Sequence, residues 1–187
     1  YKRFTGAFPP DDINPSVAQV SALDAKLKAG DAPFVELGLF GPYGERLAKL
    51  RRWNAQAWVD GSWVHRQING PSDYASWRMS WDVFACCMVM VGGATSPTLQ
   101  AYADAIKELH IIYGASGWAM IWLADEIIRS EHWLSMREFH AMKETLVPGL
   151  TNEEHPWDAI ILQSRYTHSS TLKSDWWHKH VVVPLDY

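Results

Sequence analysis

The sequence is poor in cysteine, and its only two, Cys86 and Cys87, are adjacent. Neighbouring side chains point to different sides of a helix, and a disulfide between them would be strained. The sequence therefore indicates no disulfide framework and favours a reducing, intracellular compartment, cytoplasmic or nuclear. A secretory signal is absent from the start. The apolar run FACCMVMVGGA is too short for a bilayer span, so no membrane partner is expected.

The sequence also lacks the short motifs that identify common catalytic sites. It contains no G-x-S-x-G, no P-loop, no dinucleotide fingerprint, no H-E-x-x-H and no paired C-x-x-C. We therefore predict no cofactor, identify no small-molecule substrate and consider an enzyme the less favoured class.

A strong charge of one sign is missing too, because the net charge is −4. The chain as a whole is thus no polyanion binder. Basic residues nevertheless gather at Arg46, Lys49, Arg51 and Arg52. This cluster fits either a solvated helix face or a local nucleic-acid contact.

What the sequence does contain is a large apolar fraction, 48% of 187 residues, which suits one globular domain with a substantial core. We predict a mainly α (α+β) fold, a bundle of about five to six helices with a β-hairpin near residues 54–68. Residues 1–15, rich in proline, are expected to form a flexible arm, and 16–187 a single domain. Within it, 72–166 would form the helical core and 167–187 a C-terminal tail.

Apolar residues at steps of three and four predict the helices of this core. One helix follows Ser72, a plausible N-cap, and ends at Gly92-Gly93; another has Ser96 as its cap and ends at Gly114. The longest is expected from about Gly117 to Pro148, with a break near Ser130. Its first turns are apolar nearly all round, which is typical of a buried helix.

The stretch AQAWVDGSWVHRQI predicts the hairpin, because Asp60-Gly61 suits a two-residue turn with positive φ. That turn places Trp58 opposite Trp63 on one face. The other face, with Ala55, Ala57, Val59, Val64 and Ile68, is predicted to turn toward the core. The Trp pair is then either an outward contact patch or is covered by another segment of the chain.

The cluster ADEIIRSEHW gives the candidate catalytic residues. Asp125 and Arg129 are four positions apart and can pair on one helix face. The pair is either a buried structural ion pair or, together with Glu131 and His132, part of a catalytic pocket.

The C-terminal tail carries two further candidates. His178 and His180 form an H-x-H that could bind a metal on a strand, although surface histidines near the end of the chain are the favoured explanation. Trp176 and Trp177 lie outside the helical stripes and remain available for a surface role.

Several segments resemble a multicopy protein family abundant in dinoflagellate genomes. The first shared motif is F-G-P-x-G-x-R, from Phe40 to Arg46. The second, G-P-x-x-x-x-x-W-x-x-S-W-x-V-F, runs from Gly70 to Phe84, and the third, A-D-x-x-x-R-x-E, from Ala124 to Glu131. The resemblance spans roughly residues 33–180. It implies a Gag-like or capsid-like domain of a mobile element, whose plan is a hairpin before a helical bundle.

The leading hypothesis is therefore a non-enzymatic protein-interaction domain that binds copies of itself, with Trp58, Trp63, Trp176 and Trp177 as contact residues. The first alternative is a nucleic-acid-binding module that uses the basic segment 46–52. The second is a hydrolytic or metal-dependent enzyme that uses Asp125, Glu131 and His132.

Overall fold

The computed structural model describes residues 1–38, 40, 41, 52–59, 61–146, 154–164 and 183. Its elements confirm a mainly helical bundle with a β-hairpin. In chain order they are α1 Lys2–Thr5, α2 Val17–Ala29, β1 Arg52–Val59, β2 Ser62–Asn69, α3 Tyr74–Met90, α4 Ser96–Tyr113, α5 Trp118–Ile127, the π-helical turn η1 Ile128–His132, α6 Trp133–Glu144 and α7 Asp158–Ser164.

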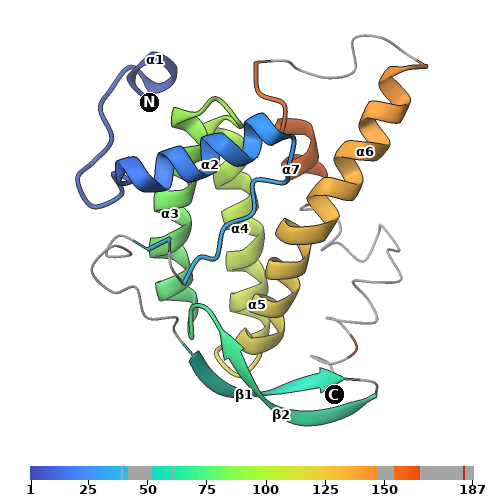
Figure 1. Cartoon of the computed structure of the whole chain (residues 1–187). Helices are drawn as coiled ribbons and strands as arrows, with labels where there is room; N and C mark the ends of the chain where they lie inside the picture. The colour runs from blue at the N-terminus through green and yellow to red at the C-terminus, as the bar shows by residue number, and fades with distance from the viewer. Residues whose placement is uncertain (39, 42–51, 60, 147–153, 165–182, 184–187) are drawn as a thin grey trace.

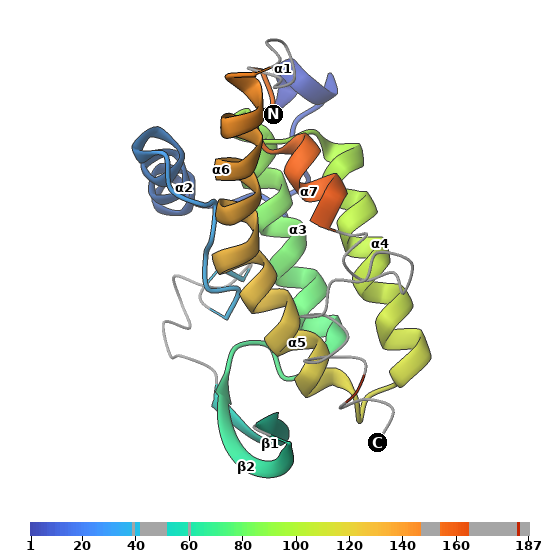
Figure 2. The same ribbon diagram turned by 90° about the vertical axis from the view of Figure 1, so that its right-hand side faces the viewer.

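Helices α3, α4 and α5 form the centre of the molecule, with α2 and α6 along its sides (Figures 1 and 2). Their facing surfaces are built from aromatic rings. Trp81 stacks on Trp77 at 5.2 Å between ring centroids and on Tyr102 at 4.9 Å. Offset stacking of this kind adds about 0.5–1.5 kcal/mol beyond the area that each pair buries. The tryptophans at helical spacing are therefore core residues, as the periodicity predicts.

The helix ends follow the capping chemistry, with two shifts of one residue. Asp73, rather than Ser72, caps α3, and its Oδ1 accepts a 2.8 Å hydrogen bond from the Ser76 amide. Thr95, rather than Ser96, precedes α4. A carboxylate is a stronger acceptor than a hydroxyl, which explains why Asp73 takes the cap position from its neighbour.

The expected break near Ser130 is a π-helical turn. Helix α5 passes through η1 into α6, and the three lie on one continuous path (Figure 1). A single π turn inserts one residue into the helix and changes which side chains face the core on either side of it.

The hairpin forms a two-stranded antiparallel sheet in the predicted register, with Trp58 opposite Trp63. Gly61 in its turn has φ 83°, as the turn type requires. Figure 2 shows the hairpin below the helices, at the opposite end of the molecule from α1. No helix within the described residues combines the length and apolarity needed to cross a bilayer.

Candidate interaction surface

The base of the hairpin is anchored to the helices by two indole groups. Trp122 Nε1 donates to the Asn69 carbonyl at 2.8 Å, and Trp118 Nε1 donates to the Pro71 carbonyl at 3.0 Å. Between them Gly70 has φ 118°, and a Cβ there would lie 2.3 Å from the Trp122 ring. The chain can leave the bundle at this point only because residue 70 has no side chain.

Burial falls quickly with distance from this anchor. Ile68 is 3% exposed and Trp53, its partner in the register, is half-buried, so this pair near the base of the hairpin packs on the core. From Ser62 to Gln67 every residue of β2 is exposed. The predicted core-facing side is thus correct at Ala55 and Ile68 and wrong at Val64, which is 38% exposed, because the hairpin extends beyond the helices that would cover it.

Trp63 is the large exposed side chain of this surface, with 41% of its area accessible. It lies in β2 on the face opposite to Ile68, since side chains alternate along a strand. The side chain of Trp58 lies outside what the structure describes, as do Trp176 and Trp177. Among the described residues no third strand pairs with the sheet, so both of its edges are unextended.

Asp125 and Arg129 lie inside the molecule, and each is 0% exposed. Asp125 Oδ2 accepts from Arg129 Nε at 2.9 Å and from Trp77 Nε1 at 3.0 Å, and Oδ1 accepts from the Tyr102 hydroxyl at 2.9 Å. We name this the Asp125 network. It ties α3, α4 and α5 together around one carboxyl group.

The guanidinium of Arg129 extends the Asp125 network to the loop after α2. Its Nη1 donates to the Val35 carbonyl at 3.0 Å, and its Cζ lies 5.3 Å from the Phe34 ring centroid and 5.6 Å from that of Trp122. Its Nη2 has no hydrogen-bond partner among the described residues. The contacts are those of a structural ion pair within an aromatic core.

The other two candidate catalytic residues do not join this network. Glu131 is exposed and His132 is half-buried, both in η1. Burial lowers the pKa of His132, and the neighbouring Glu131 carboxylate partly offsets that effect. Asp125, which donors surround on both oxygens, has no access to a substrate in this arrangement.

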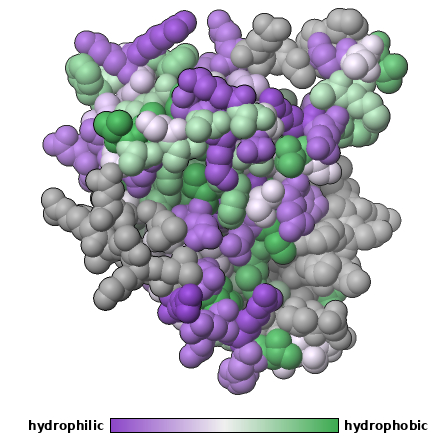
Figure 3. All heavy atoms as spheres, in the orientation of Figure 1, coloured by the Kyte–Doolittle hydropathy of each residue, from purple (hydrophilic) through white to green (hydrophobic). Residues whose placement is uncertain are grey.

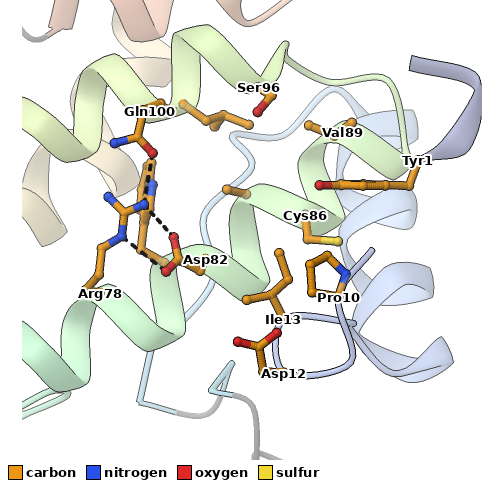
Figure 4. A pocket seen from close by; sticks show the side chains of 13 residues that line it. Tyr1, Pro10, Asp12, Ile13, Arg78, Asp82, Cys86, Val89, Ser96 and Gln100 are labelled. Carbon is orange, nitrogen blue, oxygen red and sulfur yellow. Dashed lines mark hydrogen bonds and ion pairs between the residues drawn. The ribbon is translucent and has the colours of Figure 1, made fainter. Parts of the chain in front are cut away.

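A hollow of about 370 Å³ lies between α3, α4 and the N-terminal segment (Figure 4). Three of its polar side chains bond to one another: Arg78 pairs with Asp82 and donates to Gln100 Oε1 at 2.9 Å. Burial raises the pKa of the Cys86 thiol to about 11, which disfavours the thiolate at neutral pH. None of the predicted catalytic residues lines the hollow, and we assign no chemistry to it.

The remaining predicted residues fall largely outside the described part of the chain. Arg52 is exposed at the first position of β1, whereas Arg46, Lys49 and Arg51 are outside it, as are His178 and His180. Within the described ranges, no group of three or more histidine, cysteine or carboxylate side chains is placed to hold a metal ion.

Comparison with known proteins identifies no relative: no family model, no curated protein and no solved structure matches this chain. The motifs that carry the dinoflagellate resemblance map mainly onto the core. Phe40, Trp77, Trp81, Phe84, Asp125 and Arg129 are all buried. Buried motifs of this kind determine how the chain packs. Evidence for a function must therefore come from exposed residues.

Proposed function

We propose that this chain is a non-enzymatic interaction domain that binds a second copy of itself through the hairpin. The observation that carries the proposal is the exposure of β2: residues 62–67 lie in solvent on a strand whose outer edge is unextended among the described residues. A two-stranded hairpin is marginally stable alone, and extension to four strands would complete it.

Three features favour a second copy as the partner. An edge strand paired about a two-fold axis gives the same surface to both copies, so one exposed strand is sufficient. Trp63 and Val64 would be buried there, and large aromatic residues are the usual anchors of such contacts. The anchored base at Gly70 presents the strand in a fixed position, which lowers the entropy cost of association. The family resemblance, which implies a capsid-like domain, is consistent with this proposal, because capsid domains bind copies of themselves.

The test is the mass of the protein in solution over a concentration range, with wild type and Trp63→Ala. We expect self-association that Trp63→Ala weakens by at least about tenfold, since loss of an interface anchor costs about 2 kcal/mol or more. Phe8→Ala is the matched control, because Phe8 is an exposed aromatic residue, 75% accessible, on the N-terminal segment.

A wild-type protein that stays monomeric at every concentration contradicts the proposal. If that monomer instead binds single-stranded nucleic acid with an affinity that falls as salt is added, the basic segment 46–52 becomes the better explanation.

A further inference from the structure

Helix α6 carries an apolar stripe on its outer side. Phe139, Met142 and Leu146 are 50%, 58% and 77% exposed. Leu146 lies in the turn that follows the end of α6 at Glu144, where its amide donates to the Lys143 carbonyl at 2.9 Å. The spacing of three and then four residues places the three side chains on one line.

The side chains on the opposite side of α6 contact other segments of the same chain. Trp133 is 0% exposed and its Nε1 donates to Ser164 Oγ at 3.0 Å. Arg137 donates to the Gly30 carbonyl at 3.1 Å and lies 4.8 Å from the Trp157 ring centroid. His140 Nε2 lies 2.8 Å from Gln163 Oε1.

Since residues 133, 137 and 140 face the bundle, the stripe faces solvent on the far side of the helix. Figure 2 shows α6 on the outside of the molecule, and Figure 3 shows apolar atoms near its free end at the upper right.

Two exposed charges border the stripe and indicate what covers it. Glu138 immediately precedes Phe139, and Lys143 immediately follows Met142. With Phe139 and Met142 at the a and d positions of a heptad, Glu138 is at g and Lys143 at e. A parallel pair of identical helices brings g of one copy beside e of the other, five residues further along. Glu138 would then meet Lys143 of the second copy, twice in one dimer.

We propose that α6 pairs in parallel with α6 of a second copy about a two-fold axis. An antiparallel pair would place Glu138 against Glu138 and Lys143 against Lys143, and so would be repulsive. The Lys143 ammonium lies 4.5 Å from the Phe139 ring centroid, so its stem already covers one edge of the stripe. The surface is a single heptad long, so the association is weak and depends on concentration.

This second surface is independent of the hairpin contact, although both serve self-association. A charge-exchange experiment tests it. Glu138→Lys and Lys143→Glu are each expected to weaken self-association of the Trp63→Ala protein about tenfold, because each turns two attractive pairs into two repulsive ones. An equimolar mixture of the two variants, or the double variant, should restore the parent affinity.

Glu108→Lys and Lys107→Glu are the matched controls, because both residues are exposed on α4 and their substitution changes the net charge by the same amount. They should leave the affinity unchanged. Single α6 variants that associate like their parent, or a mixture that fails to recover, overturn the proposal. Loss of association with Trp63→Ala alone, with no effect of the α6 charges, leaves only the hairpin contact.

The direction of pairing has its own test. Leu146→Cys should form a disulfide-linked dimer on mild oxidation, because parallel helices place residue 146 beside its copy. Cys86 and Cys87 are 2% and 0% exposed and serve as internal thiols that stay reduced. Cross-linking only when Phe139→Cys and Leu146→Cys proteins are mixed would show antiparallel pairing and contradict the proposal, as would cross-linking of neither.

Discussion

Asp125 is a single carboxyl group on which three helices depend. A buried carboxyl is costly unless donors surround it, and here Arg129, Trp77 and Tyr102 supply them. Each of these groups is itself polar and buried, so each also needs Asp125. The intact network therefore adds little net free energy to folding. Removal of any one member is nevertheless strongly destabilising, because it leaves the others buried without a partner.

Removal of one member of the network should therefore lower the free energy of unfolding substantially. Asp125→Ala leaves the buried guanidinium without its charge partner and should lower the free energy of unfolding by about 3–5 kcal/mol. Tyr102→Phe removes one donor to the carboxyl and should cost about 1.5–3 kcal/mol.

Urea unfolding followed by Trp fluorescence measures both costs. Tyr74→Phe is the control, because Tyr74 is half-buried and its hydroxyl interacts with the Arg78 side chain outside the network. Equal losses for Tyr74→Phe and Tyr102→Phe would show that the network contributes nothing beyond packing.

At the scale of elements, the junction between the hairpin and the helical bundle determines which residues of the hairpin are exposed to solvent. The indoles of α5 hold the carbonyls of Asn69 and Pro71, and Gly70 packs directly under the Trp122 ring. Next to this point the Trp53–Ile68 pair packs on the core, and residues 62–67 of β2 lie in solvent.

Substitutions at two glycines, one in the turn and one at the base of the hairpin, distinguish the cost of backbone strain from that of steric crowding. Both Gly61 and Gly70 have positive φ, but a Cβ at Gly61 meets nothing within 4 Å whereas one at Gly70 meets Trp122. Gly61→Ala should cost about 1–2 kcal/mol from the left-handed conformation alone. Gly70→Ala adds a ring displacement of about 1–3 kcal/mol. Thermal and urea unfolding of the two variants check the order, and equal stabilities would contradict the tight junction.

At the scale of the whole molecule, the two proposed surfaces lie far apart. The hairpin is at one end of the bundle, and α6 ends at the other (Figures 1 and 2). A protein with two separate two-fold surfaces does not stop at a dimer, because each copy added offers one unused surface.

The two sets of substitutions should therefore act on different stages of assembly. Wild type at high concentration should exceed a dimer in mass. Trp63→Ala should stop at a dimer held by α6, and Glu138→Lys at a dimer held by the hairpin. The combined variant should be a monomer. Sedimentation velocity of the four proteins measures this directly, and a combined variant that still exceeds a dimer would require a third surface.

Local chemistry made much of this fold predictable. The Asp60-Gly61 turn determines the strand register by itself, because its loop length leaves one pairing. Leu99, Tyr102, Ile106 and Leu109 are buried as their spacing predicts, since one face of an amphipathic helix has to meet the core. Periodicity does not act at the very end of a helix: Val17, the first residue of α2, is 84% exposed.

The sequence alone determined the helices of the core, the hairpin and the pairing of Asp125 with Arg129, because each depends on residues close together along the chain. It did not predict the short helix α1, which lies in the segment expected to be a flexible arm. Only the tertiary structure decided that Trp77 and Tyr102 complete the Asp125 network, that residues 62–67 of β2 lie in solvent and that the apolar stripe of α6 points away from the bundle. Those outcomes depend on which surfaces distant segments cover, and coverage is a property of the packed chain that residue spacing does not encode.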